Sequence, residues 1–420
     1  MEELTETTLA QVDATDGVGV WDARRALAAV ARERPAPERV DVGAVDIVTD
    51  VAGIEALAAD YRHLYRLTGN TLPFATQEWH LAWCEHLLTR SRRTSQEPLF
   101  CVARNGAGTC VGLVPLILTR RRLGALTVGA LGLVGADPKL TEIRNPLIEP
   151  GYERAVLGAL QERLASVPGW DWIQWSGVSP ALAAALNVEA TPQWYEKLDA
   201  YVLDLPRSWD EFRSGLRRNV RESLRHCYNS LRRDGHDFEL VVARDPVEVR
   251  WALYRFLQLH TLRAQMPWGP SHVDRFAAQS LRAFLYGVCE RLAARDAVRV
   301  FQLRIGATVV ASRIGFVVGD GLYLYYSGFD PAWARYSVMT TTVAEALRYA
   351  IASGLRSVNL SLTAEQSKLR WHPRRIDFHS ALVARSSVRS RLACAVYRCA
   401  ISGASQRLSL RRLAAARSWG

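Results

Sequence analysis

Between Leu322 and Gly354 the sequence gathers side chains that can move protons and hold anions. Tyr326 closes a run of alternating aromatic and aliphatic residues, and its phenol is a candidate for donating a proton or orienting a substrate. Asp330 follows in a Phe-Asp-Pro turn, where a carboxylate either takes part in catalysis or caps the turn through its own backbone. Because aromatic residues in strands commonly serve packing, a structural role for Tyr326 stays open beside the chemical one.

A helix is expected from Ser337 to Ser353, and its start is a candidate anion site. The first N–H groups of a helix lack partners inside it, and the aligned peptide dipoles add partial positive charge there. Ser337 is a suitable N-cap, and Arg335 adds a charged, forked donor. The candidate phosphate-binding residues are Arg335, Tyr336, Ser337, Val338, Met339 and Thr340. The alternative is that Ser337 only caps the helix and Arg335 pairs with a surface acid.

Two titratable side chains outside this stretch are further candidates. His260 lies late in a predicted helix and is either a base that titrates near neutral pH or a hydrogen-bonded histidine at the helix edge. Lys368 follows the last predicted strand, and it either binds a carboxylate or phosphate or is a solvated surface lysine. It is one of three lysines in a chain whose other basic residues are arginines.

The elements that must position these residues occur twice. "FCVARNGAGTCVGLVPL" and "FQLRIGATVVASRIGF" each predict a hairpin after helical patterns and before a further helix and strand. We expect an α/β protein with two related modules, each a mixed, mostly antiparallel sheet flanked by helices, although two unrelated hairpins would also fit the weak identity. The expected divisions are a disordered acidic lead-in at 1–45, modules at 46–195 and 196–385, and a basic amphipathic tail at 386–420.

The second module carries a family resemblance. Its Tyr-rich strand, "SGFDPAWARYS", the amphipathic helix, Gly354, a strand and "KLRW" (368–371) resemble GNAT-type acyltransferases, and more closely the CelD-like acetyltransferase domain, a relative of Fem-type aminoacyl transferases. Residues 46–195 look like a degenerate first half. The resemblance implies that the strand before the turn splays from its neighbour, that acyl-CoA is the co-substrate without a metal, and that its pyrophosphate sits at the turn. The expected substrate-binding residues are Tyr325, Asn359, Lys368 and Trp371.

One departure from the family concerns the turn itself. Ser337-Val338-Met339 stands where relatives carry glycines or Ser-Pro-Gly, and side chains hinder the backbone approach that glycine permits. Three functions therefore compete. The first is acyl transfer from acyl-CoA to an amine or hydroxyl of a small molecule, sugar or cell-envelope precursor. The second is transfer from aminoacyl-tRNA, as in Fem-type enzymes, and the third is non-catalytic binding to an anionic surface.

Charge and composition set further limits. The 420 residues carry a formal net charge of +11, but residues 386–420 hold seven arginines and no acid. That tail predicts either contact with an anionic membrane surface or a helix packed on the protein body. Seven scattered cysteines favour reduced, buried thiols. Without a recognisable signal sequence or apolar span, we expect a cytoplasmic protein, peripheral at the inner membrane face at most, with no nucleic-acid partner except tRNA in the second reading.

Overall fold

The computed structural model describes residues 41–135, 140–268 and 272–400, all within one compact unit that starts at Pro37. The expected lead-in therefore lies almost wholly outside the described residues, as does the end of the tail, 401–420. The first strand of the described residues, β1, begins at Ala44, close to the predicted start of the first module.

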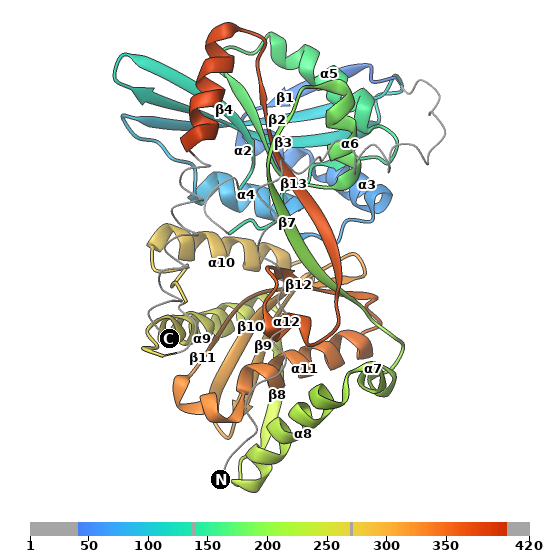
Figure 1. The fold of residues 1–420 in the computed structure, drawn as a ribbon, viewed down its shortest axis with the longest axis vertical. Helices are drawn as coiled ribbons and strands as arrows, with labels where there is room; N and C mark the ends of the chain where they lie inside the picture. Colours follow the sequence, from blue (N-terminus) through green and yellow to red (C-terminus); the bar gives the residue numbers. More distant parts are fainter. Residues whose placement is uncertain (1–40, 136–139, 269–271, 401–420) are drawn as a thin grey trace, which may run out of the picture. The chain divides into compact units, whose positions relative to one another are not determined.

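Thirteen strands of the described chain form one sheet (Figure 1), and the first half of the chain builds one end of it. In sheet order its strands are β1 (Ala44–Val48), β2 (Thr94–Arg104), β3 (Cys110–Leu123), β4 (Leu126–Leu133) and β6 (Trp172–Val178), with the short β5 (Leu147–Ile148) paired to β3. Neighbours from β1 to β4 are antiparallel, whereas β4 and β6 run parallel.

The second half repeats this order at the other end of the sheet. Its strands are β8 (Phe238–Ala243), β9 (Val298–Ile305), β10 (Thr308–Val318), β11 (Gly321–Phe329) and β12 (Ser357–Leu362). The first four are antiparallel neighbours, and β11 and β12 run parallel. The predicted fold class, two tandem modules with mostly antiparallel sheets and flanking helices, is confirmed.

Two long strands, β7 (Gln193–Asp204) and β13 (Arg374–Ala384), join the halves. β7 pairs with β12 of the second half, while β13 lies between β7 and β6 of the first half. The expected boundary at residues 195–196 thus falls inside β7, and the end of the expected second module returns to the sheet of the first. The residues of a strand do not reveal a partner about 200 positions away, so this return was not predictable from the local pattern.

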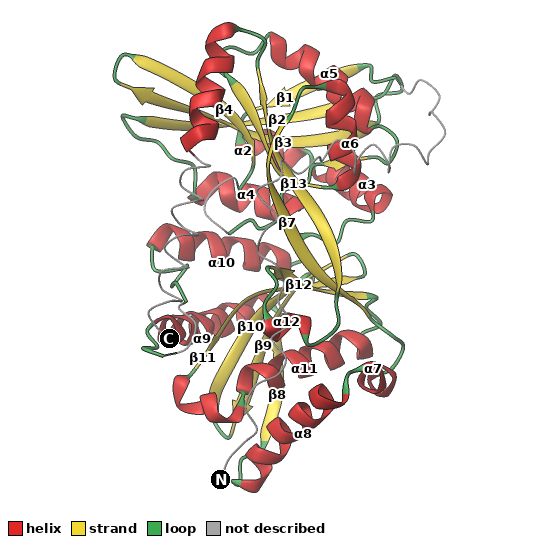
Figure 2. Ribbon diagram, in the orientation of Figure 1, coloured by secondary structure: helices red, strands yellow, loops and turns green. Residues whose placement is uncertain are grey.

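Helices cover both faces of the sheet (Figure 2). Those of the first half are α2 (Val51–Ala56), α3 (Ala58–Thr68), α4 (Gln77–His86), α5 (Glu153–Ala165) and α6 (Pro180–Glu189), with the 3-10 turn η1 (Pro73–Ala75). Those of the second are α7 (Trp209–Gly215), α8 (Arg218–Arg233), α9 (Pro246–Ala264), α10 (Gln279–Ala293), η2 (Pro331–Tyr336), α11 (Val338–Ala352) and α12 (Gln366–Leu369). A further helix spans 388–400.

Local sequence explains many helix starts. The side chains of Thr76, Ser179, Ser208 and Asp245 each accept a hydrogen bond from a backbone N–H of the first helical turn. Proline at the first position of α6 and α9 adds a backbone angle that already suits a helix. In α8 the apolar residues at helical spacing are all buried, namely Val220, Leu224, Cys227 and Leu231.

The core between the two halves is aromatic. Trp79 of α4 is fully buried, packs edge-on against Phe284 of α10 and Phe316 of β10, and donates a hydrogen bond from Nε1 to Thr141 Oγ1 (2.9 Å). Replacing such a side chain by alanine typically costs about 3–5 kcal/mol. One continuous core therefore fixes the elements of both halves around the site.

Six of the seven cysteines are buried, as expected, and Cys399 is exposed. No helix in the described ranges is long and apolar enough to cross a bilayer. Within the same ranges, no group of three His, Cys, Asp or Glu side chains is arranged to hold a metal ion.

Candidate functional site

The site begins where two parallel strands separate. β11 and β12 pair only from Gly321 to Tyr323, opposite Ser357 to Asn359. Beyond these residues β11 continues beside β10 alone, and it carries a β-bulge there: Arg313 pairs with Ser327 and Gly315 with Leu324, so two residues of β11 oppose one of β10. Bulges bend a strand and increase its twist, so the sheet opens at this point.

The bulge corrects the expected placement of the tyrosines. Strict alternation predicts Tyr325 and Tyr326 on opposite faces of β11, but their ring centroids lie 4.5 Å apart. The Tyr326 ring also packs against His260 (5.7 Å) and Phe276 (5.3 Å). Because an extra residue shifts the alternation by one position, both phenols lie on the face that α9 and α10 cover.

A carboxylate from the first half reaches this face. Glu142 Oε2 accepts hydrogen bonds from the Tyr323 hydroxyl and from Ser361 Oγ (2.6 Å). The Tyr325 hydroxyl donates to the carbonyl of Leu140, two residues earlier in the same loop (2.6 Å). Strands β11 and β12 therefore hold the loop around residues 140–142 through three side-chain hydroxyls.

Burial controls the protonation of this cluster. Loss of water raises the pKa of the Glu142 carboxyl above its ordinary value, although the hydrogen bonds from Ser361 and Tyr323 and the charges of Lys368 and Arg313 oppose that shift. Burial also raises the pKa of the Tyr323 and Tyr326 hydroxyls, which stay protonated. The cluster thus combines a carboxyl that titrates closer to neutral pH with two phenols that can donate.

Two cations flank the cluster. Burial lowers the pKa of Arg313 to about 10, and its Nη2 reaches the Leu324 carbonyl at 3.4 Å. Lys368 Nζ donates to the Leu362 carbonyl and to Thr363 Oγ1 (3.3 Å), and burial lowers its pKa. Lys368 is therefore a buried, partnered ammonium and not the solvated lysine of the alternative reading.

A cleft of about 1100 Å³ lies where β11 and β12 begin, and of the residues next to the cluster Asn359 lines it. Its floor includes Gly321, Ser357 and Asn359, and Thr71 and Asn145 of the first half lie along its wall. Asn359 connects the cleft to the cluster, because it stands opposite Tyr323 and its Oδ1 accepts the N–H of Ser361 (2.8 Å). The cleft has the size and the mixed lining of a small-molecule site.

The predicted anion site lies at the far end of β11. Ser337 occupies the N-cap position of α11 as predicted, but its side chain makes no capping hydrogen bond. Its φ of 53° and ψ of 40° belong to the left-handed region that glycine favours. Ser337 thus has a backbone conformation typical of glycine, and its carbonyl accepts the Thr340 N–H (2.8 Å) at the start of the 15-residue helix.

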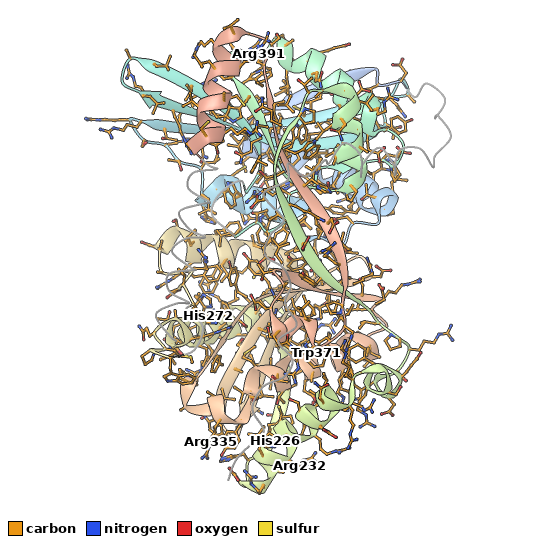
Figure 3. All side chains as sticks on the ribbon, in the orientation of Figure 1. His226, Arg232, His272, Arg335, Trp371 and Arg391 are labelled. Carbon is orange, nitrogen blue, oxygen red and sulfur yellow. The ribbon has the colours of Figure 1, made fainter. Side chains whose placement is uncertain are left out.

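The side chains before Ser337 are in part held by the protein itself. Arg335 lies over the Tyr336 ring (4.5 Å from Cζ to the centroid) and 3.8 Å from Asp234 Oδ2, as the surface-pair alternative predicts, yet it is 71% exposed. Tyr336 is buried, and its hydroxyl donates to Asp234 (2.9 Å). Figure 3 labels Arg335 together with Arg232 and His226 at the same end of the second half.

The side chains of the remaining turn residues are wholly or partly buried. Val338 is buried in a small core with Leu231, and Met339 packs against that core, while Thr340 is half-buried. Arg370 lies near this turn, because Arg370 and Ser337 both act on Cys227. Burial raises the pKa of the Cys227 thiol, and the charge of Arg370 and a hydrogen bond with the Ser337 side chain oppose that rise. Arg370 also donates to Ser223 Oγ of α8 (2.7 Å).

His260 does not have a free ring nitrogen. Its Nδ1 lies 3.0 Å from the Ser327 carbonyl, which can only accept, so Nδ1 carries the proton. Its Nε2 accepts the N–H of Arg275 (3.3 Å), and burial lowers its pKa. Both nitrogens interact with backbone groups, which matches the structural alternative.

Two other candidates also have structural partners. Asp330 Oδ1 accepts the N–H of Ala332 (3.0 Å) and so caps η2, as the turn reading predicts. Trp371 is buried in the core beneath α11 and stacks on Phe212, with ring centroids 6.4 Å apart. It is not among the residues that line the cleft.

The sequence analysis missed Glu142, Ser361 and Arg370. Glu142 lies 181 residues from Tyr323 and 219 from Ser361, so no local spacing joins them. Ser361 has a φ of 74°, which only the three-dimensional path of β12 imposes. Arg370 was within reach, because "KLRW" already stood out and an arginine suits a phosphate better than its lysine neighbour.

A splayed parallel strand pair, a bulged strand and a helix-start turn define an acyltransferase fold of the GNAT type. Residues 218–369 match the family described as "Acetyltransferase (GNAT) domain", which confirms the GNAT-type resemblance read from the sequence for this part of the chain. No curated protein matches the sequence.

Solved structures agree with this fold. A crystal structure of FemX, 9% identical, matches with a TM-score of 0.50 over 73% of this chain and 91% of its own. A tandem GNAT protein from the clavulanic acid biosynthesis pathway, 13% identical, has a TM-score of 0.42 over 81% of this chain and 98% of its own. The C-terminal domain of a putative lysylphosphatidylglycerol synthetase from Agrobacterium fabrum, 12% identical, gives 0.46 over 80% and 94%. At such identity the FemX likeness establishes the fold alone.

Proposed function

We propose that this protein transfers an acyl group from acyl-CoA to an amine or hydroxyl of an acceptor bound in the cleft. The observation that carries the proposal is the course of β11, which parts from β12, bulges and leads through Ser337 into the start of α11. The acceptor classes that fit are a small molecule, a sugar or a cell-envelope precursor, since the cleft offers amides and hydroxyls beside charged groups.

The donor would lie with its pyrophosphate at the start of α11. The N–H groups of Val338 and Met339 bind the anion there, while that of Thr340 already donates to the Ser337 carbonyl (2.8 Å), and Arg335 adds charge from the solvent side. Tyr336 orients Arg335 by lying under its guanidinium. The residues present fit this group because the backbone of Ser337 has the left-handed conformation that such a turn needs.

The side-chain cluster around Glu142, beside the strand fork where β11 and β12 separate, would carry out the proton transfers. Glu142 takes the proton that the acceptor loses as its nitrogen or oxygen bonds to the acyl carbon. Its raised pKa suits a base that works near neutral pH. Tyr326 returns a proton to the departing thiol sulfur, and the raised pKa of its phenol keeps it protonated for that purpose. Asn359 and Lys368 position the acceptor and its charge, and Tyr325 holds the Glu142 loop.

Transfer from aminoacyl-tRNA is the second candidate, and the surface of α8 favours it. Exposed arginines follow the side of the helix opposite its buried stripe, namely Arg217, Arg218, Arg221, Arg225 and Arg232. Within α8 the sole acid is Glu222, which pairs with Arg218 (2.7 Å). Such a face attracts a phosphate backbone. Non-catalytic binding of an anionic surface would use the same arginines.

Calorimetric titration with acetyl-CoA and with coenzyme A tests the donor. We expect saturable binding that Arg335→Ala weakens about tenfold, the size of one exposed charge-assisted contact. Arg250→Ala is the matched control, because this exposed arginine of α9 pairs with Glu290 away from the turn. If no binding occurs with millimolar ligand while labelled acyl groups pass from charged tRNA, the aminoacyl-tRNA function replaces the proposed one.

A further inference from the structure

The helix at residues 388–400 has one face fixed to the first half of the protein. Cys394 is fully buried, and the Tyr397 ring stacks on Trp172 of β6 with centroids 4.9 Å apart. Ser390 donates from Oγ to Asp171 (2.9 Å). The tail therefore begins as a helix packed on the protein body, which is one of the two readings of its sequence.

The opposite face of this helix is apolar and exposed. Val388, Leu392 and Val396 are 80%, 66% and 64% exposed. At about 100° per residue these three fall within one narrow stripe, on the side of the helix away from Cys394 and Tyr397. Exposed aliphatic residues scattered singly need no explanation, but three in one stripe form a continuous surface.

Arginines border the stripe on both sides. By the same geometry Arg389 flanks it on one side, and Arg391 and Arg398 flank it on the other. Figure 3 labels Arg391 on this helix. No acid occurs in the sequence after Asp377. Long arginine side chains can reach charged headgroups while the apolar stripe between them enters the acyl region.

A neighbouring hairpin has the same composition. Arg389 donates to the carbonyl of Thr127, which places the helix beside the start of β4 (Figure 1). The tip between β3 and β4 exposes Leu123 and Leu126 next to the exposed Arg121 and Arg122. Between Glu97 and Asp137 the sequence has no acid. Both surfaces thus combine exposed aliphatic side chains with arginines, although Arg389 also lies 3.8 Å from Asp171.

We propose that the outward face of helix 388–400 docks on the surface of a bilayer that contains anionic lipids. A second copy of this chain is a poor occupant, because it would bring the flanking arginines against one another. Residues 401–420 are no better matched, since they carry four arginines and no acid. Anionic headgroups complement the arginines, and an acyl boundary accepts Val388, Leu392 and Val396. This docking is independent of which donor the GNAT domain uses.

Co-sedimentation of the full chain with vesicles tests the proposal. We compare vesicles of phosphatidylglycerol and phosphatidylcholine at about 3:7 with phosphatidylcholine alone. We expect binding to the anionic vesicles. In the triple variant Val388→Ser/Leu392→Ser/Val396→Ser the vesicle affinity should fall about tenfold or more, because each substitution removes aliphatic carbons that docking would bury in the bilayer. The matched control is Leu67→Ser/Val188→Ser/Val247→Ser, three exposed aliphatic positions elsewhere.

Each outcome decides the matter. Anionic binding that the helix variant loses and the control keeps supports the proposal. Binding that the helix variant keeps overturns it and places the contact on other arginines. Absence of vesicle binding also overturns it, and light scattering on the same samples then shows whether the face joins two copies or stays within one chain. Circular dichroism of both variants should match the parent, because all six side chains are exposed.

Discussion

The two halves of the molecule build the same strand fork and use it differently. β4 and β6 run parallel as β11 and β12 do, and in each half a helix connects the pair. In the second half residues 330–337 form a tight turn before α11. In the first half residues 134–152 separate β4 from α5, and this longer connection brings Glu142 to the fork of the second half.

The helix starts after the two turns differ in charge. α11 has no acid in its first turn and is preceded by the exposed Arg335. α5 has Glu153 in its first turn, and that carboxylate accepts the N–H of Gly151 (2.8 Å). A carboxylate at the start of a helix interacts favourably with the partial positive charge there and repels a second anion. The start of α5 therefore disfavours binding of a further anion, while the loop before it supplies Glu142 to the second half.

The largest expected effect comes from replacing Glu142, the carboxylate that the first half supplies to the second. Glu142→Gln keeps the shape of the side chain but cannot take a proton, so we expect kcat to fall about 10²–10³-fold, the usual worth of a general base, with little change in acyl-CoA affinity. Steady-state kinetics measure both. Glu149→Gln, in the same loop, is the control. A Glu142→Gln enzyme as fast as the parent would remove Glu142 from the chemistry.

The pH profile sharpens the same point. Because burial raises the pKa of Glu142, kcat/KM should be low in acid and rise with pH through a pKa above the ordinary range of a carboxyl, near 4. The base must be ionised to work, so activity is gained as the proton is lost. In the slower Glu142→Gln variant, kcat/KM should no longer rise with pH in this range. A limb at an ordinary carboxyl pKa would contradict the assignment.

A smaller effect concerns the shape of the turn in the second half. Ser337→Gly should stabilise the protein by about 0.5–1 kcal/mol, since glycine accepts a positive φ without steric cost. Thermal unfolding measures the change, and binding of acyl-CoA should persist. Ser353→Gly at the other end of α11 is the control: its φ is −82°, so glycine there should not stabilise. A loss of stability in Ser337→Gly would show that the serine side chain outweighs its backbone strain.

The smallest expected effect concerns the turn in the first half. Calorimetry should find one equivalent of acyl-CoA per chain, and Glu153→Gln should leave that number unchanged, because the long connection before α5 lacks the compact turn of the second half. A second equivalent in the parent protein would mean that both forks bind the donor and would end the comparison.

Much of this protein follows from its sequence alone. Helices, hairpins and the position of the turn before α11 were predictable, because capping side chains, prolines and apolar spacing act within a few residues. The buried stripe of α8 and the three strands from 298 to 329 are cases in which the local pattern sufficed. Even the departure at Ser337 was visible, although not that its backbone would keep the conformation of glycine.

Tertiary structure decided the rest. A single extra residue in β11 moved Tyr326 to the face of Tyr325, the return of β13 to β6 dissolved the expected boundary between modules, and a loop of the first half carried Glu142 to Tyr323 and Ser361. These features depend on register and on partners about 200 residues distant. The free energy that selects them comes from contacts formed only in the folded chain, and short-range sequence patterns do not contain it.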